Sequence, residues 1–233
     1  MALMRSHLRP ARSLDTLFAK TTNLGEQVYE HLREQILSRQ FPGGVELPEG
    51  RLAEHLQVSR TPMREALVRL VGEGLLERSA ERAYRVRAVS TREYFECMQL
   101  REILECYAID QAITTVTDAD LGSLRRELRA LGDSVEDDMP HWRFENRFHS
   151  FFALKAGDAT LADTITRMRV IARLFRISSR YHRKREFDSE HLAIIEAVER
   201  RDSPAAKAAM RAHLRNLQDA VRQAVAAEMH PGA

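Results

Sequence analysis

The stretch 58–67, VSRTPMREAL, constrains the fold most, because its residues predict one short helix with two chemically different faces. Ser59 is suited to the N-cap, where its side chain can accept a backbone N–H bond. Pro62 then lies in the first turn, where its missing N–H leaves no helical bond unmade. Apolar residues at helical spacing mark one side of this helix as buried, so the opposite side is left for a partner. These apolar residues are Met63, Ala66, Leu67 and Leu70.

The polar face of this helix carries Arg60, Thr61 and Arg64. The two arginines stand four positions apart, so both side chains leave the same face near the N-terminus, where a recognition helix meets base edges. Each guanidinium could bind a guanine through two hydrogen bonds. A lone arginine on a helix is more often solvated or ion-paired, and Arg60 could equally pair with Glu54 or Glu65. The surrounding elements therefore matter to the interpretation.

Those elements complete a small domain. Amphipathic spacing predicts a helix over 25–38 and a second from about residue 49 to 57, and a tight turn then leads into the stretch 58–67. Extended patterns at 75–78 and 84–89 predict a two-stranded wing. Three helices and a wing within about 65 residues are typical of a winged helix-turn-helix, whose wing lies on the DNA backbone or minor groove.

From Ser90 onwards the pattern is entirely helical. Six or so amphipathic helices are expected over about 140 residues, and pairs such as Thr117 with Asp120 and Ser203 with Pro204 mark helix starts. An antiparallel all-α bundle of this kind commonly holds a ligand or metal in its interior. The protein is thus expected to be mainly α. The expected parts are a flexible tail over 1–22, a winged helix-turn-helix over 23–89 and a ligand-sensing and dimerisation domain over 90–233.

One group of residues in the bundle has the composition of a metal site. Glu145 and His149 stand four apart on one helical face, so both can reach one ion. His191 and His213 lie inside apolar helical patterns of two further helices. One carboxylate and three imidazoles suit zinc, nickel, iron or manganese, with positions left for water or a ligand. A buried histidine is more often a hydrogen-bonded core residue, so spacing alone leaves both interpretations open.

Charge and hydropathy add weaker constraints. The net charge is +2, and the excess of basic over acidic residues lies in residues 1–90, which is compatible with phosphate binding. No run approaches the roughly 18 apolar residues of a membrane span, and the N-terminus lacks an apolar signal segment. Cys97 and Cys106 have the spacing of neither a disulfide nor a metal motif. We therefore expect a cytoplasmic protein with no membrane partner.

Several motifs resemble the DNA-binding domain of the GntR family of bacterial regulators over residues 24–89. They are LPE at 47–49, RLAE at 51–54, the stretch 58–67 and GLL at 74–76. Ala83 stands where the family usually places a glycine after the wing-tip arginine. The resemblance implies a set of DNA contacts: Ser59 and Thr61 on phosphates, Arg60 and Arg64 on bases or phosphates, and Arg82 at the wing tip.

Residues 91–229 resemble the FCD ligand-binding domain that accompanies this type of GntR domain. In that domain an aspartate and a histidine four apart, followed by two later histidines, bind a metal ion. Glu145 stands where the aspartate is usual, and glutamate coordinates equally well but is one methylene longer. The resemblance implies a divalent transition metal held by Glu145, His149, His191 and His213.

The same resemblance gives the first helix of this domain an inward arginine that receives carboxylate ligands, and Arg101 matches it. Arg101 shares a helical stripe with Met98 and Ala108, and its donors suit a carboxylate partner. A pair with Glu105, four positions along, is an equally acceptable role.

These expectations describe a ligand-responsive, sequence-specific transcriptional regulator rather than an enzyme. A homodimer would read a short pseudo-palindromic operator in double-stranded DNA, and a small carboxylate effector would act through the linker around residues 89–91. Two alternatives stay open. One is a metal-dependent enzyme with a fused DNA-binding domain, since an open metal position can activate water. The other is a DNA-binding dimer with no effector.

Overall fold

The structure is a computed structural model that describes residues 23–38, 40–80, 83–132, 139–178 and 184–229. The expected tail over 1–22 and the wing-tip Arg82 lie outside these residues. Two compact units share the described residues. The first holds those up to Ser90 together with Arg173–Ser178, and the second holds the others.

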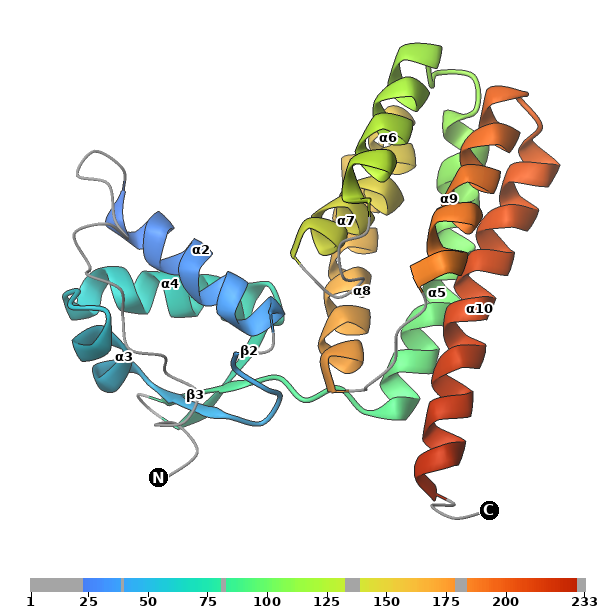
Figure 1. The fold of residues 1–233 in the computed structure, drawn as a ribbon. Coiled ribbons are helices and arrows are strands. Elements are labelled where there is room, and N and C mark those ends of the chain that lie inside the picture. Colours follow the sequence, from blue (N-terminus) through green and yellow to red (C-terminus); the bar gives the residue numbers. More distant parts are fainter. Residues whose placement is uncertain (1–22, 39, 81–82, 133–138, 179–183, 230–233) are drawn as a thin grey trace. The chain divides into compact units, whose positions relative to one another are not determined.

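The first unit is built on three helices, α2 (Leu24–Leu37), α3 (Glu49–His55) and α4 (Arg60–Gly72) (Figure 1). The Asn23 side chain caps α2 by accepting a bond from the Gly25 N–H at 3.0 Å. Gln57 has a φ of 51° in the turn between α3 and α4, which reverses the chain sharply there. α4 packs on both α2 and α3. Its buried stripe is the predicted one: Met63, Ala66, Leu67 and Leu70.

The wing contains a strand that the sequence did not reveal. β2 (Leu76–Ala80) and β3 (Ala83–Val86) pair antiparallel as expected, but β1 (Glu46–Pro48) adds to the other edge of β3, in the order β1-β3-β2. The prediction of a two-stranded wing was therefore wrong. β1 has three residues and ends in proline, so it is too short to show the alternation that marks a strand.

The second unit is entirely helical in the part that the structure describes. Its helices α5 and α10 lie side by side along the length of the bundle (Figure 1). α10 packs on α5 and α9, α5 also packs on α7, and α6 lies against α7 and α9. Thr117 and Asp120 form the predicted capping box of α6. None of the described helices is long and apolar enough to cross a membrane. The helices from residue 91 onwards are α5 (Thr91–Ala112), α6 (Asp118–Leu131), α7 (Met139–Lys155), α8 (Ala159–Ser178), α9 (Lys184–Glu199) and α10 (Ser203–Met229). The last residues of α8, Arg173–Ser178, belong to the first unit.

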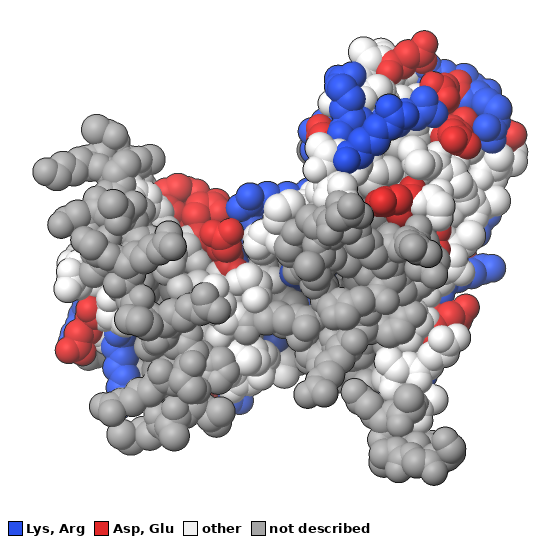
Figure 2. Space-filling view, viewed as in Figure 1, with Lys and Arg blue, Asp and Glu red and all other residues white. Residues whose placement is uncertain are grey.

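The mainly α fold, with a winged helix-turn-helix followed by a helical bundle, is confirmed. Figure 2 shows acidic and basic side chains intermixed over one end of the bundle. The described residues on the face shown there therefore form no patch of a single charge sign of the kind that attracts DNA phosphates.

Candidate functional site

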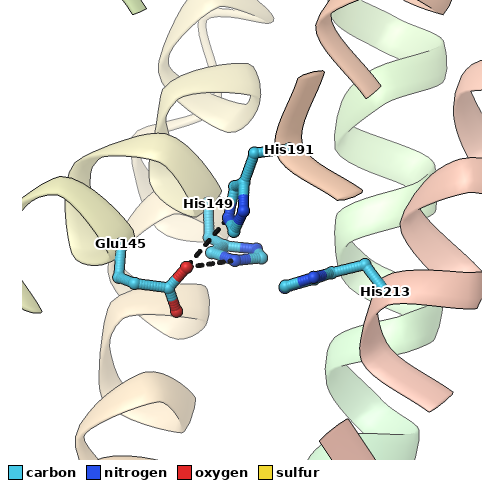
Figure 3. A group of neighbouring side chains, drawn as sticks. All are labelled: Glu145, His149, His191 and His213. Atoms are coloured by element: carbon cyan, nitrogen blue, oxygen red, sulfur yellow. Dashed lines mark ion pairs between the residues drawn. The ribbon is translucent and has the colours of Figure 1, made fainter. Parts of the chain in front are cut away.

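Three helices of the bundle bring four potential metal ligands to one point (Figure 3). Glu145 and His149 come from α7, His191 from α9 and His213 from α10, and their ligand atoms all lie within 4.8 Å of one another. Glu145 Oε1 is 2.8 Å from His191 Nε2 and 3.6 Å from His149 Nε2. All four side chains are buried. The four residues grouped from sequence spacing are therefore neighbours in space.

The outer nitrogens of two of these imidazoles face carboxylates. His149 Nδ1 is in hydrogen-bond contact with Glu105 of α5, and His213 Nδ1 lies 2.8 Å from Glu190 Oε2. An ionised carboxylate only accepts hydrogen bonds, so Nδ1 carries the proton and a neutral ring keeps its lone pair on Nε2. The Nε2 atoms of His149 and His213 make no hydrogen bond to any described residue. Buried lone pairs left open in this way fit a metal ion.

The charges and burial around the cluster favour the protonation states in which these side chains can bind a metal. Burial lowers the pKa of His213 to about 3, so its ring is neutral at pH 7. Burial alone would raise the pKa of Glu145, but the charge of Arg169 and the contacts with His149 and His191 together outweigh it and hold that pKa well below its usual value. The pKa of Glu105 is likewise held at about 2, because Arg101 and His149 overcome the effect of burial.

Two buried arginines adjoin the cluster. Arg101 Nε donates to Glu105 Oε1 at 2.7 Å, which is the pairing that the spacing of four residues allowed, and Arg169 Nη2 of α8 donates to Glu145 Oε2 at 3.1 Å. Burial lowers the pKa of Arg169 to about 10, and the nearby charge of Arg101 acts in the same direction. Arg101 Nη2 and Arg169 Nε are buried and find no acceptor among the described residues. These two donors are available to an anion.

Sequence spacing did not single out Glu105 as a partner of His149, nor Arg169 as a member of the site. Glu105 carried a partial signal, because a charged residue on the buried face of an amphipathic helix needs a partner. Arg169 carried none, since arginine is common in amphipathic helices and its partner Glu145 is on another helix.

The predicted DNA-contacting residues of α4 all lie on its exposed face. They are Ser59, Arg60, Thr61 and Arg64. Ser59 is the N-cap with extended backbone, but its side chain makes no capping bond, so that detail of the prediction was wrong. Pro62 occupies the third helical position and has no N–H to offer the serine hydroxyl.

Arg64 is ion-paired, and its partner, Glu49 of α3, is one that the sequence did not suggest. Arg60 forms no ion pair with Glu54 or Glu65 in the part of the chain that the structure describes. The outward position of Arg60 is therefore compatible with contact to DNA.

Known proteins share both units. The family of bacterial regulatory proteins called gntR matches residues 24–86, and the FCD domain matches residues 96–216. The HTH-type transcriptional repressor RspR of Escherichia coli (strain K12) is 27% identical over 218 residues, which cover 91% of this chain and 94% of that protein. The HTH-type transcriptional regulator McbR of the same strain is 34% identical over 117 residues, 50% of this chain and 53% of McbR.

Solved structures agree with these matches. The structure of E. coli McbR/YncC has a TM-score of 0.72 and 25% identity, and the match covers 87% of this chain and 99% of that one. A putative transcriptional regulator GntR from Rhodococcus sp. RHA1 shares the fold with a TM-score of 0.74 at 20% identity, covering 87% of this chain and 99% of the other. On these grounds the chain belongs to the GntR family of bacterial transcriptional regulators and carries an FCD domain.

Proposed function

We propose that this DNA-binding regulator is a homodimer that senses a small organic acid through a divalent transition metal. The ligands would be Glu145, His149, His191 and His213. The observation that carries the proposal is the convergence of their buried ligand atoms within 4.8 Å. When bound, the metal would supply positive charge and open coordination positions for an effector. Zinc, nickel, iron and manganese all accept this set of oxygen and nitrogen donors.

An anionic effector follows from the charges around that centre. Arg101 and Arg169 already balance the carboxylates of Glu105 and Glu145. A divalent ion would add positive charge that the buried surroundings cannot solvate. The unpaired donors Arg101 Nη2 and Arg169 Nε would then bind a carboxylate, which accepts two hydrogen bonds in the plane of its oxygens.

Dimerisation is supported by an apolar stripe on α5. Leu100, Ile103 and Tyr107 lie at helical spacing and are 49%, 66% and 52% exposed, respectively. A second copy could cover this stripe through a two-fold axis, the commonest symmetry of soluble oligomers. The dimer would present two α4 helices to the half-sites of a short pseudo-palindromic operator.

On each half-site, Ser59 and Thr61 would bind phosphates while Arg60 and Arg64 read bases. The start of α4 assists them, because its first backbone N–H groups have no side-chain cap and can meet a phosphate. Arg82, which the family resemblance implies at the wing tip, would make a further contact. Effector binding would act through the linker around residues 89–91 and so change the spacing of the two helices.

The experiment that tests the sensing function is a thermal-shift screen of carboxylic and sugar acids, with and without zinc or nickel. Wild type should be stabilised by one acid only when metal is present, by about 2.7 kcal/mol at a ligand concentration 100 times Kd. His213→Ala should lose bound metal by elemental analysis and lose the acid response. His55→Ala, which removes a histidine outside the cluster, is the control.

Equal metal content in wild type and His213→Ala would overturn the metal assignment. Stabilisation by an acid in both proteins would indicate a sensor that works without a metal. Absence of stabilisation by any acid would indicate a DNA-binding dimer without an effector. Consumption of the acid by the metal-loaded protein would instead indicate an enzyme.

A further inference from the structure

Arg64 and Glu49 form an ion pair that differs from the others on α4. Arg64 Nε donates to Glu49 Oε2 at 3.1 Å and Arg64 Nη2 donates to Glu49 Oε1 at 2.7 Å, so the contact is bidentate. The Arg64 side chain is 53% exposed, whereas that of Glu49 is only 4% exposed. The carboxylate is thus buried, whereas the guanidinium side chain is half exposed.

The neighbouring pair of Arg69 and Glu26 provides a contrast. It also joins α4 to another helix, at 2.5 Å, but its side chains are 48% and 44% exposed. Both partners of that pair are therefore solvated. A buried carboxylate such as that of Glu49 has few conformations, and it restricts the arginine that it binds.

The two bonds to Glu49 occupy one edge of the planar guanidinium, and the other edge has no partner among the described residues. The Nε and Nη2 atoms define the side edge, which faces the carboxylate. The end edge, made by Nη1 and the second N–H of Nη2, still has two parallel donors. Guanine presents two acceptors, N7 and O6, in the major groove. Adenine presents an acceptor and a donor there, so two parallel donors discriminate between these bases.

We infer that Glu49 is a positioning residue for sequence recognition: it orients Arg64 so that the end edge of its guanidinium meets a guanine in each half-site. Fixing the side chain before DNA binds reduces the entropy lost when the base contact forms. Because the pair carries no net charge, Arg64 contributes to base discrimination more than to attraction of the backbone. The inference rests on the proposed base contact by Arg64.

The test uses the full-length protein and an operator selected by wild type from random DNA duplexes. Each base pair of the operator is then replaced in turn, and fluorescence anisotropy measures affinity for every duplex and for unrelated DNA. The proteins are wild type, Glu49→Gln, Arg64→Ala, the double variant and Glu26→Gln. Glu26→Gln is the matched control, because it removes a carboxylate paired to another arginine of α4. Circular dichroism verifies that each variant is folded.

Glu49→Gln should lower the preference for guanine at one position per half-site by about ten-fold, the order expected for one bidentate base contact. Its affinity for unrelated DNA should stay equal or rise, because a negative charge is lost near the phosphates. Preference at the other positions should not change. In the Arg64→Ala background the Glu49→Gln change should have no further effect on base preference. Glu26→Gln should retain the wild-type preference.

The outcomes separate the two claims. If Arg64→Ala keeps the guanine preference, the proposed base contact is wrong. If Arg64→Ala loses the preference and Glu49→Gln keeps it, the base contact stands and positioning by Glu49 is wrong. Equal loss of affinity for operator and unrelated DNA in Glu49→Gln would also contradict positioning. Should Glu49→Gln fail to fold, Glu49→Asp retains the charge but withdraws the carboxylate by one methylene, and it is judged by the same loss of guanine preference.

Discussion

At the scale of single residues, Glu105 links the two parts of the proposed sensor. One carboxylate oxygen accepts from Arg101 and the other contacts His149 Nδ1. It thereby joins the candidate anion-binding arginine to a candidate metal ligand through one side chain. An effector that draws Arg101 away from Glu105 would leave the negative charge of the Glu105 carboxylate less neutralised. That carboxylate would then polarise His149 more strongly, which makes the imidazole a stronger ligand.

We predict that Glu105→Gln weakens metal binding by about 10-fold to 100-fold, the range found for carboxylates that orient metal-bound histidines. Competition with a chromophoric chelator measures the affinity. Glu102→Gln is the control, because Glu102 lies on the same helix but pairs with Arg215, at 3.0 Å, away from the cluster. Unchanged metal affinity in folded Glu105→Gln would show that the contact with His149 does not support metal binding.

At the scale of helices, the start of α6 has a cap that can be titrated. Asp120 accepts from the Thr117 N–H, and Lys155 lies 2.7 Å from its carboxylate. The hydrogen bonds from Lys155 and Thr117 lower the pKa of Asp120 to about 2. A carboxyl group whose pKa is depressed by folding stabilises the protein above its unfolded pKa. That contribution is lost as pH falls through the folded value.

Asp120→Asn should therefore reduce the free energy of unfolding by about 1 kcal/mol at pH 6, as loss of a helix cap does. The difference from wild type should shrink below about pH 4, where the carboxyl group of the unfolded chain becomes protonated, and should be largely lost below about pH 2, where that of the folded protein does. Urea denaturation at a series of pH values measures it. Asp118→Asn is the control, since Asp118 lies in the same first turn and is largely exposed. An equal loss in both variants would indicate general charge effects rather than the cap.

Helix positions were predictable because each helix carries its own pattern of spacing and caps. The capping box of α6 and the buried stripe of α4 appear as the sequence indicates. Elements that depend on a distant partner were missed. β1 exists through pairing with β3, as in the opposed residues Glu46 and Arg85, which form an ion pair at 2.6 Å.

At the scale of the whole molecule, the proposed function requires two copies of the chain. We predict that Ile103→Asp, in the middle of the exposed α5 stripe, converts a dimer to a monomer at micromolar concentration, because a charge would be buried in an apolar interface. Light scattering after gel filtration measures the mass. Operator affinity should fall as well, since each monomer contacts only one half-site.

The matched control for this prediction is Leu154→Asp, which places the same charge on a side chain that is 61% exposed on α7, outside the stripe. If Ile103→Asp stays dimeric, the α5 stripe is not the dimer interface. If the wild-type protein is itself monomeric at these concentrations, the proposed dimer is wrong.

The sequence by itself determined what local spacing and motifs can encode: the amphipathic helix at 58–67, the order of helices, and four candidate metal ligands, whose proximity the fold then bears out. Tertiary structure decided which charges meet. Glu105 and His149 are 44 residues apart, Arg169 and Glu145 are 24 apart, and Arg64 and Glu49 are 15 apart. Such pairs leave no periodic signal, because each partner lies on a different helix. Only the packing of those helices selects one carboxylate among the many that an arginine or histidine could bind.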